Sequence, residues 1–61
     1  MKVGDKVKIV KKTFLHNGIF VLTNSIVEIV DITEDGYHVV YKDKEGNPHI
    51  LKLQVQDLTS V

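Results

Sequence analysis

The chain has 61 residues, eight basic and eight acidic side chains that cancel to a formal net charge of zero, and no cysteine. A chain this short supports a single hydrophobic core, so residues 1–61 are expected to form one domain with little room for an enclosed substrate pocket. The lack of thiols excludes a disulfide framework, a thiolate zinc site and a cysteine nucleophile, and it favours a reducing compartment, the cytoplasm.

The first third of the sequence predicts a strand followed by a hairpin. Over residues 6–12 valine and isoleucine alternate with lysine, the period of a strand with one buried face, and Val3-Gly4-Asp5 ahead of it predicts a tight turn. Asn17-Gly18 between two apolar runs indicates a two-residue type I′ turn. The resulting register pairs His16 with Ile19, Leu15 with Phe20, Phe14 with Val21, and Thr13 with Leu22.

The two faces of this hairpin differ in their expected surroundings. Alternation places one apolar set on the face of Val7 and Ile9, which the first strand buries: Leu15, Phe20 and Leu22. The opposite face carries a second apolar set, larger than a solvated hairpin normally shows: Phe14, Ile19 and Val21. We predict that this second set contacts another protein. The alternative is that a strongly bent strand buries both faces.

The middle of the chain predicts a second hairpin. Residues 26–32 are too β-branched for a stable helix, and residues 37–42 follow after Asp35-Gly36. If those two residues form the loop, Ile32 lies opposite Val39 and Val30 opposite Tyr41. A bulged register that pairs Glu28 with Lys42 is the alternative.

The last third predicts a third hairpin and a short closing strand. Residues 43–47 predict a type I turn closed by a bulge at Gly46. This turn places Tyr41 opposite His49 and Val39 opposite Leu51. One apolar face then collects five side chains: Tyr37, Val39, Tyr41, Leu51 and Leu53. Residues 54–57 suit a single 3₁₀ turn, and residues 58–61 a closing strand.

The order of these features resembles the SH3-like small β-barrels of bacterial proteins. The likeness rests on the opening Val3-Gly4-Asp5-Lys6-Val7-Lys8-Ile9, the long first hairpin, two tighter turns, and the closing Val55-Gln56-Asp57-Leu58-Thr59-Ser60-Val61. It implies an all-β, five-stranded barrel with a long first hairpin and a 3₁₀ turn before the last strand. The resemblance is to the fold alone, because many unrelated families share these patterns. The tryptophan typical of peptide-binding SH3 grooves is missing.

Catalytic and metal-binding chemistry is not expected. His38 and His49 point to opposite faces of one predicted hairpin, and His16 lies at the tip of another, so the three imidazoles do not converge on a metal ion. Carboxylates such as those of Glu34 and Asp35 lie in turns, where solvation leaves their acidity ordinary. No serine or threonine stands in a spacing that suggests a catalytic triad. We expect no catalytic residue, no cofactor and no small-molecule substrate.

These observations favour a non-enzymatic protein-interaction module, an accessory or regulatory subunit that binds another protein or a second copy of itself. The alternative is RNA or DNA binding through lysines near the first strand: Lys6, Lys8, Lys11 and Lys12. The neutral charge balance favours the first hypothesis, because binding to phosphates usually needs a cationic excess. No membrane partner is expected, since no segment approaches the roughly 18 apolar residues of a membrane span.

Overall fold

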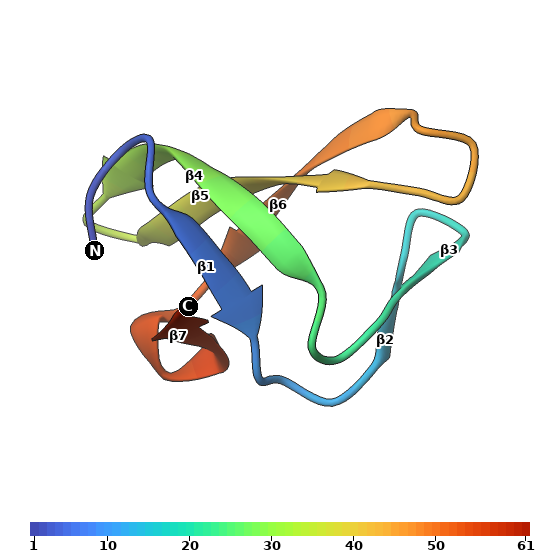
Figure 1. Cartoon of the computed structure of the whole chain (residues 1–61), viewed down its shortest axis with the longest axis horizontal. Helices are drawn as coiled ribbons and strands as arrows, with labels where there is room; N and C mark the ends of the chain where they lie inside the picture. The colour runs from blue at the N-terminus through green and yellow to red at the C-terminus, as the bar shows by residue number, and fades with distance from the viewer.

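A computed structural model of residues 1–61 shows an all-β chain built from two antiparallel sheets (Figure 1). The larger sheet has five strands in the order β6-β5-β4-β1-β7, and β2 pairs with β3 in the smaller one. The bounds are β1 Lys6–Ile9, β2 Phe14–His16, β3 Ile19–Val21, β4 Ile26–Thr33, β5 Gly36–Lys42, β6 Pro48–Leu53, a 3₁₀ turn at Val55–Asp57, and β7 Leu58–Ser60. The all-β class and the 3₁₀ turn are confirmed, while the paired strands do not close into a barrel.

The first hairpin, β2 and β3, has the predicted turn and register. Asn17 and Gly18 both have positive φ, 48° and 83°, as a type I′ turn requires. The three inner cross-strand pairs are those expected: His16 with Ile19, Leu15 with Phe20, and Phe14 with Val21. Thr13 and Leu22 do not extend the ladder. Instead the Thr23 hydroxyl donates to the Lys11 carbonyl at 2.7 Å, which closes the base of the hairpin.

The side of this hairpin that faces the core is the opposite of the one predicted. Val21 is fully buried, and Phe14 and Ile19 pack against the core, whereas the set expected inside is exposed: Leu15, Phe20 and Leu22. The cause lies in the connection. β1 ends at Ile9 and residues 10–13 are not in a strand, so alternation does not carry over from β1 to β2.

The pairing of β4 with β5 also differs from the prediction. The loop is formed by Glu34 and Asp35, and a bulge between Ile29 and Asp31 shifts the register. The observed pairs are Thr33 with Gly36, Ile32 with Tyr37, Asp31 with His38, Ile29 with Val39, and Glu28 with Val40. The predicted pairs Ile32–Val39 and Val30–Tyr41 and the alternative pair Glu28–Lys42 are therefore all wrong.

Gly36 explains why the loop lies one residue earlier. Its φ is +145°, and a Cβ at this position would lie 2.8 Å from the carbonyl oxygen of Leu53. The Gln54 side chain crosses the same point and donates to the Asp35 carbonyl at 2.8 Å. The glycine is needed for this close approach between the loop and the end of β6, so it begins β5 and does not occupy the turn.

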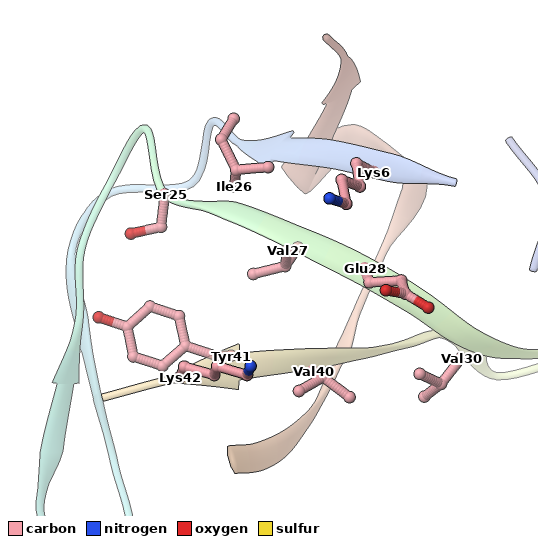
Figure 2. Close-up of a pocket in the computed structure, with 9 residues that line it drawn as sticks. All are labelled: Lys6, Ser25, Ile26, Val27, Glu28, Val30, Val40, Tyr41 and Lys42. Carbon is pink, nitrogen blue, oxygen red and sulfur yellow. The ribbon is translucent and has the colours of Figure 1, made fainter. Parts of the chain in front are cut away.

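Beyond the pair Glu28–Val40, β4 and β5 diverge. The ladder has no pair between the first residues of β4 and the last residues of β5, and a groove of about 540 Å³ lies there. Figure 2 shows Val27 and Tyr41 pointing into the space between the two strands. The same part of β4 pairs with β1 on its other side, where Val7 lies opposite Val27.

Ten buried apolar side chains form one core, nine of them from the larger sheet and one, Val21, from β3. Its members are Val7, Ile9, Val21, Val27, Ile29, Val39, Tyr41, Leu51, Leu53 and Leu58. β5 and β6 have the predicted register, with Tyr41 opposite His49 and Val39 opposite Leu51, and Gly46 takes the positive φ of 83° expected of the bulge. No helix of the structure is long and apolar enough to cross a membrane.

Candidate functional site

The exposed side of the first hairpin carries three large apolar side chains, which we call the hairpin face: Leu15, Phe20 and Leu22. They are exposed to 62%, 67% and 50%, and among the exposed large hydrophobic residues only Val61 is more exposed than Leu15 and Phe20. Leu15 and Phe20 are directly opposite each other on β2 and β3, so they form one continuous apolar surface. A contiguous exposed apolar cluster is a candidate contact surface.

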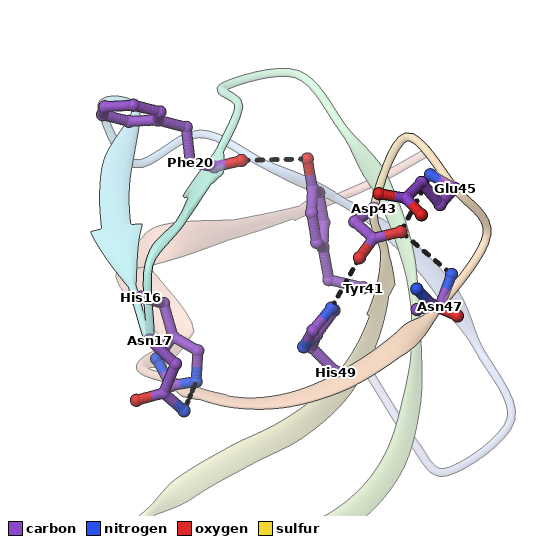
Figure 3. Close-up of polar contacts among 8 residues, drawn as sticks. All are labelled: His16, Asn17, Phe20, Tyr41, Asp43, Glu45, Asn47 and His49. Atoms are coloured by element: carbon purple, nitrogen blue, oxygen red, sulfur yellow. Dashed lines mark hydrogen bonds and ion pairs between the residues drawn. The ribbon is translucent and has the colours of Figure 1, made fainter.

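The hairpin face is held outward by contacts on the other side of β3. The Tyr41 hydroxyl, which reaches out from the core, donates to the backbone carbonyl of Phe20 at 3.3 Å (Figure 3). Val21, the next residue, is fully buried. Because neighbouring residues of a strand point to opposite sides, burial of Val21 fixes the outward direction of the Phe20 ring.

A cleft of about 400 Å³ separates the hairpin from the turn between β5 and β6. Its lining joins the hairpin face to a polar rim: Ile19, Phe20, Leu22, Tyr41, Asp43, Lys44 and Glu45. The apolar wall comes from β3, from Leu22 directly after it and from Tyr41 of β5, and the charged wall comes from the turn. A partner that covers the hairpin face would therefore meet charged side chains at its edge, which is the arrangement of an interface with an apolar centre and a polar rim.

Asp43 organises the turn that forms the charged wall. One carboxylate oxygen accepts the backbone N–H groups of Glu45 and Asn47, both at 2.9 Å, and the other accepts the ring N–H of His49 at 2.9 Å (Figure 3). These hydrogen bonds, chiefly that from His49, lower the pKa of the Asp43 carboxyl below its ordinary value of 3.8. The sequence correctly predicted Tyr41 as the cross-strand neighbour of His49, and it did not predict the contact of His49 with Asp43.

The residues predicted to form the contact surface occupy the inner side of the hairpin. Val21 has no exposed surface, and Ile19 and Phe14 are half-buried. The Lys11 ammonium nitrogen lies 4.6 Å from the centroid of the Phe14 ring, a cation–π contact that covers part of the remaining surface. The inner side thus contributes to the core, and the apolar surface open to a partner is the hairpin face.

The lysines of the alternative hypothesis do not form one strip. Lys6 and Lys8 alternate with buried Val7 and so share the outer side of β1, while Lys11 lies over the hairpin and Lys12 is exposed in the connection. None of the eight lysines of the chain lies within 4.0 Å of a carboxylate, because the two ion-pair contacts both involve histidine.

The histidines lie in three separate places. His16 contacts the side-chain amide of Asn17 at the hairpin tip, and His38 lies 3.9 Å from the carboxylate of Asp31 on the larger sheet. His49 contacts Asp43. No group of three or more histidine, aspartate or glutamate side chains is placed to hold a metal ion.

Comparison of the chain with protein-family models, with curated proteins and with solved structures found no match. The surfaces and charges of the molecule therefore provide the basis for inferring its function.

Proposed function

We propose that the chain is a non-enzymatic protein-interaction module, an accessory or regulatory subunit that contacts another protein or a second copy through the hairpin face. The observation that carries this proposal is the exposure of Phe20 and Leu15 as a cross-strand pair on a hairpin whose other side is anchored in the core. Aromatic side chains are enriched at the centres of interfaces, and covering a Phe ring removes a large apolar area from water. Phe20 is the expected anchor of the contact.

The SH3-like barrel remains our proposal for the parent architecture. β1 pairs with β4 on one side and with β7 on the other, and the 3₁₀ turn at Val55–Asp57 leads directly into β7. Together with the β2–β3 hairpin between β1 and β4, this order supports descent from such a barrel, although each strand of that hairpin has only three residues. It indicates a fold and no particular partner, since this architecture serves many unrelated functions.

The test compares two charged substitutions at exposed apolar positions. Phe20→Asp alters the hairpin face, and Ile50→Asp is the matched control on β6, where Ile50 is 57% exposed. Tagged wild-type chain and both variants are used to capture partners from the native cells, and sedimentation measures self-association. We expect the wild type and Ile50→Asp to retain the same partner or dimer and Phe20→Asp to lose it, with little change in thermal unfolding. Equal retention by all three chains would contradict the proposal.

Nucleic-acid binding is a second candidate, supported by one observation. Lys6 and Lys8 project from the same side of β1, and neither is neutralised by an ion pair within the chain. Binding to phosphates would release counterions, so the affinity for short RNA or DNA would fall steeply as salt increases. A titration at about 50 mM and 200 mM salt tests this. Absence of binding at the lower concentration would remove this candidate.

A further inference from the structure

The groove between β4 and β5 has free backbone groups in its walls. In an antiparallel ladder, successive residues direct their N–H and C=O groups to alternate sides. Val27 lies opposite Val7; on either side of this pair the Ser25 carbonyl accepts the N–H of Ile9, and Ile29 donates its N–H to the carbonyl of Asp5, just before β1. Odd-numbered residues of β4 therefore bond to β1. The backbone groups of Ile26 and Glu28 consequently face β5.

The same reasoning applies to β5. Asp43 donates its backbone N–H to the Asn47 carbonyl across the turn, so odd-numbered residues near the end of β5 bond towards β6. The groups of Val40 and Lys42 therefore face β4. Val40 meets Glu28, but the ladder ends there, and no pair joins Lys42 to Ile26. The register thus directs the backbone groups of Ile26 and Lys42 into the groove.

The side chains around these free edges combine an apolar surface with positive charge. The lining residues are Lys6, Ser25, Ile26, Val27, Glu28, Val30, Val40, Tyr41 and Lys42 (Figure 2). Val27 and Tyr41 are buried and form the floor, whereas Ile26 and Val30 are exposed to 51% and 38%. With two lysines and one glutamate, the lining has a formal charge of +1. Neither lysine has a carboxylate partner within 4.0 Å.

We propose that this groove binds an extended peptide segment of a partner protein, with an acidic side chain of that segment placed between Lys6 and Lys42. An extended backbone supplies the alternating donors and acceptors that the free edges of β4 and β5 lack, which is the principle of strand addition. Apolar side chains of the segment cover Ile26 and Val30, and the acidic one is attracted by the two unpaired ammonium groups. None of the three side chains of the hairpin face lines this groove, and Tyr41 is the one residue that lines both the groove and the cleft beside the hairpin.

The test uses ¹⁵N-labelled full chain and two sets of capped pentapeptides. Both sets vary Val, Ile and Thr at the four outer positions, and the central residue is Glu in one set and Gln in the other. We expect the Glu set at millimolar concentration to shift the amide resonances of Ile26 and Lys42 most strongly. The Gln set should bind about two- to fivefold more weakly, as expected for a solvent-accessible ion pair. Glu-centred peptides that are N-methylated at the central residue should lose binding, because they lack the backbone donor.

Charge reversal at Lys42 tests whether this lysine attracts the acidic side chain. Lys42→Glu should abolish the preference for Glu over Gln, while Lys52→Glu, an equal change of charge on β6 outside the groove lining, should preserve it. Thermal unfolding of both variants confirms that they are folded. The proposal is overturned if neither peptide set shifts these resonances, if Glu and Gln peptides bind equally, or if a short oligonucleotide alone binds at the groove. Loss of the hairpin contact through Phe20→Asp would leave peptide binding intact, so the two proposals fail separately.

Discussion

Truncation of two adjacent residues on β3 provides a direct test of which side of the first hairpin is buried. Val21 has no exposed surface and Phe20 is 67% exposed, although they are neighbours in the chain. Val21→Ala removes the equivalent of two buried methylene groups, each worth about 0.8 kcal/mol. The cavity that remains raises the expected loss in free energy of unfolding to about 2–3 kcal/mol. Phe20→Ala, the larger deletion, should change the free energy of unfolding by no more than about 0.5 kcal/mol.

The expected difference is large relative to the stability of so small a chain. At roughly 0.05–0.15 kcal/mol per residue, a domain of this length has a total free energy of unfolding of about 3–9 kcal/mol. Each kcal/mol corresponds to about 4–8 °C in a domain of this size, so Val21→Ala should lower the melting temperature by about 8 °C or more. Circular dichroism during thermal and urea unfolding measures both quantities.

Two results would refute this reasoning. A greater loss for Phe20→Ala than for Val21→Ala would mean that the inner and outer sides of the hairpin are exchanged. An unchanged melting temperature for Val21→Ala, accompanied by faster amide exchange throughout β2 and β3, would mean that the hairpin opens by itself and contributes little to the main core.

Two further predictions concern the turns. Gly36→Ala should destabilise the chain by about 1–3 kcal/mol, because residue 36 has a φ of +145° and an added Cβ would lie 2.8 Å from the Leu53 carbonyl oxygen. Gly46 also has positive φ but lies in open space, so Gly46→Ala should lower the melting temperature less. The second prediction is that Asp43 contributes to stability in a pH-dependent way. Since its folded-state pKa is lowered, chiefly by His49, its contribution is present above the ordinary value of 3.8 and is lost as pH falls through the folded-state pKa. The difference in melting temperature between wild type and Asp43→Asn should therefore be larger at pH 5 than at pH 2, and an equal difference at both would refute the role of the carboxylate.

Local turn chemistry made much of the fold predictable. Asn17-Gly18 fixes a type I′ turn because both central residues need positive φ, and that turn alone sets which residues of β2 and β3 are paired. The five-residue turn closed by Gly46 did the same for β5 and β6. The turn between β4 and β5 was misplaced by one residue because the reason for Gly36 is a contact with the end of β6, about 17 residues further along the chain.

The candidate surfaces were less predictable, because they depend on how elements are oriented to one another. Alternation identifies two sets of side chains on a hairpin, and it cannot say which set meets the core once residues 10–13 interrupt the strand. The groove depends on the bulge after Ile29 and on the divergence of β4 from β5 beyond Glu28. No local signal in the sequence specifies that divergence.

The amino-acid sequence by itself determined the all-β class, the positions of most strands, two of the three hairpin registers and the 3₁₀ turn at Val55–Asp57, because each depends on neighbouring residues. Tertiary structure alone decided that Val21 is buried and Phe20 exposed, and that the edges of β4 and β5 remain open. These features arise where segments far apart in the chain compete for the same core, and that competition is settled by the packing of the whole molecule.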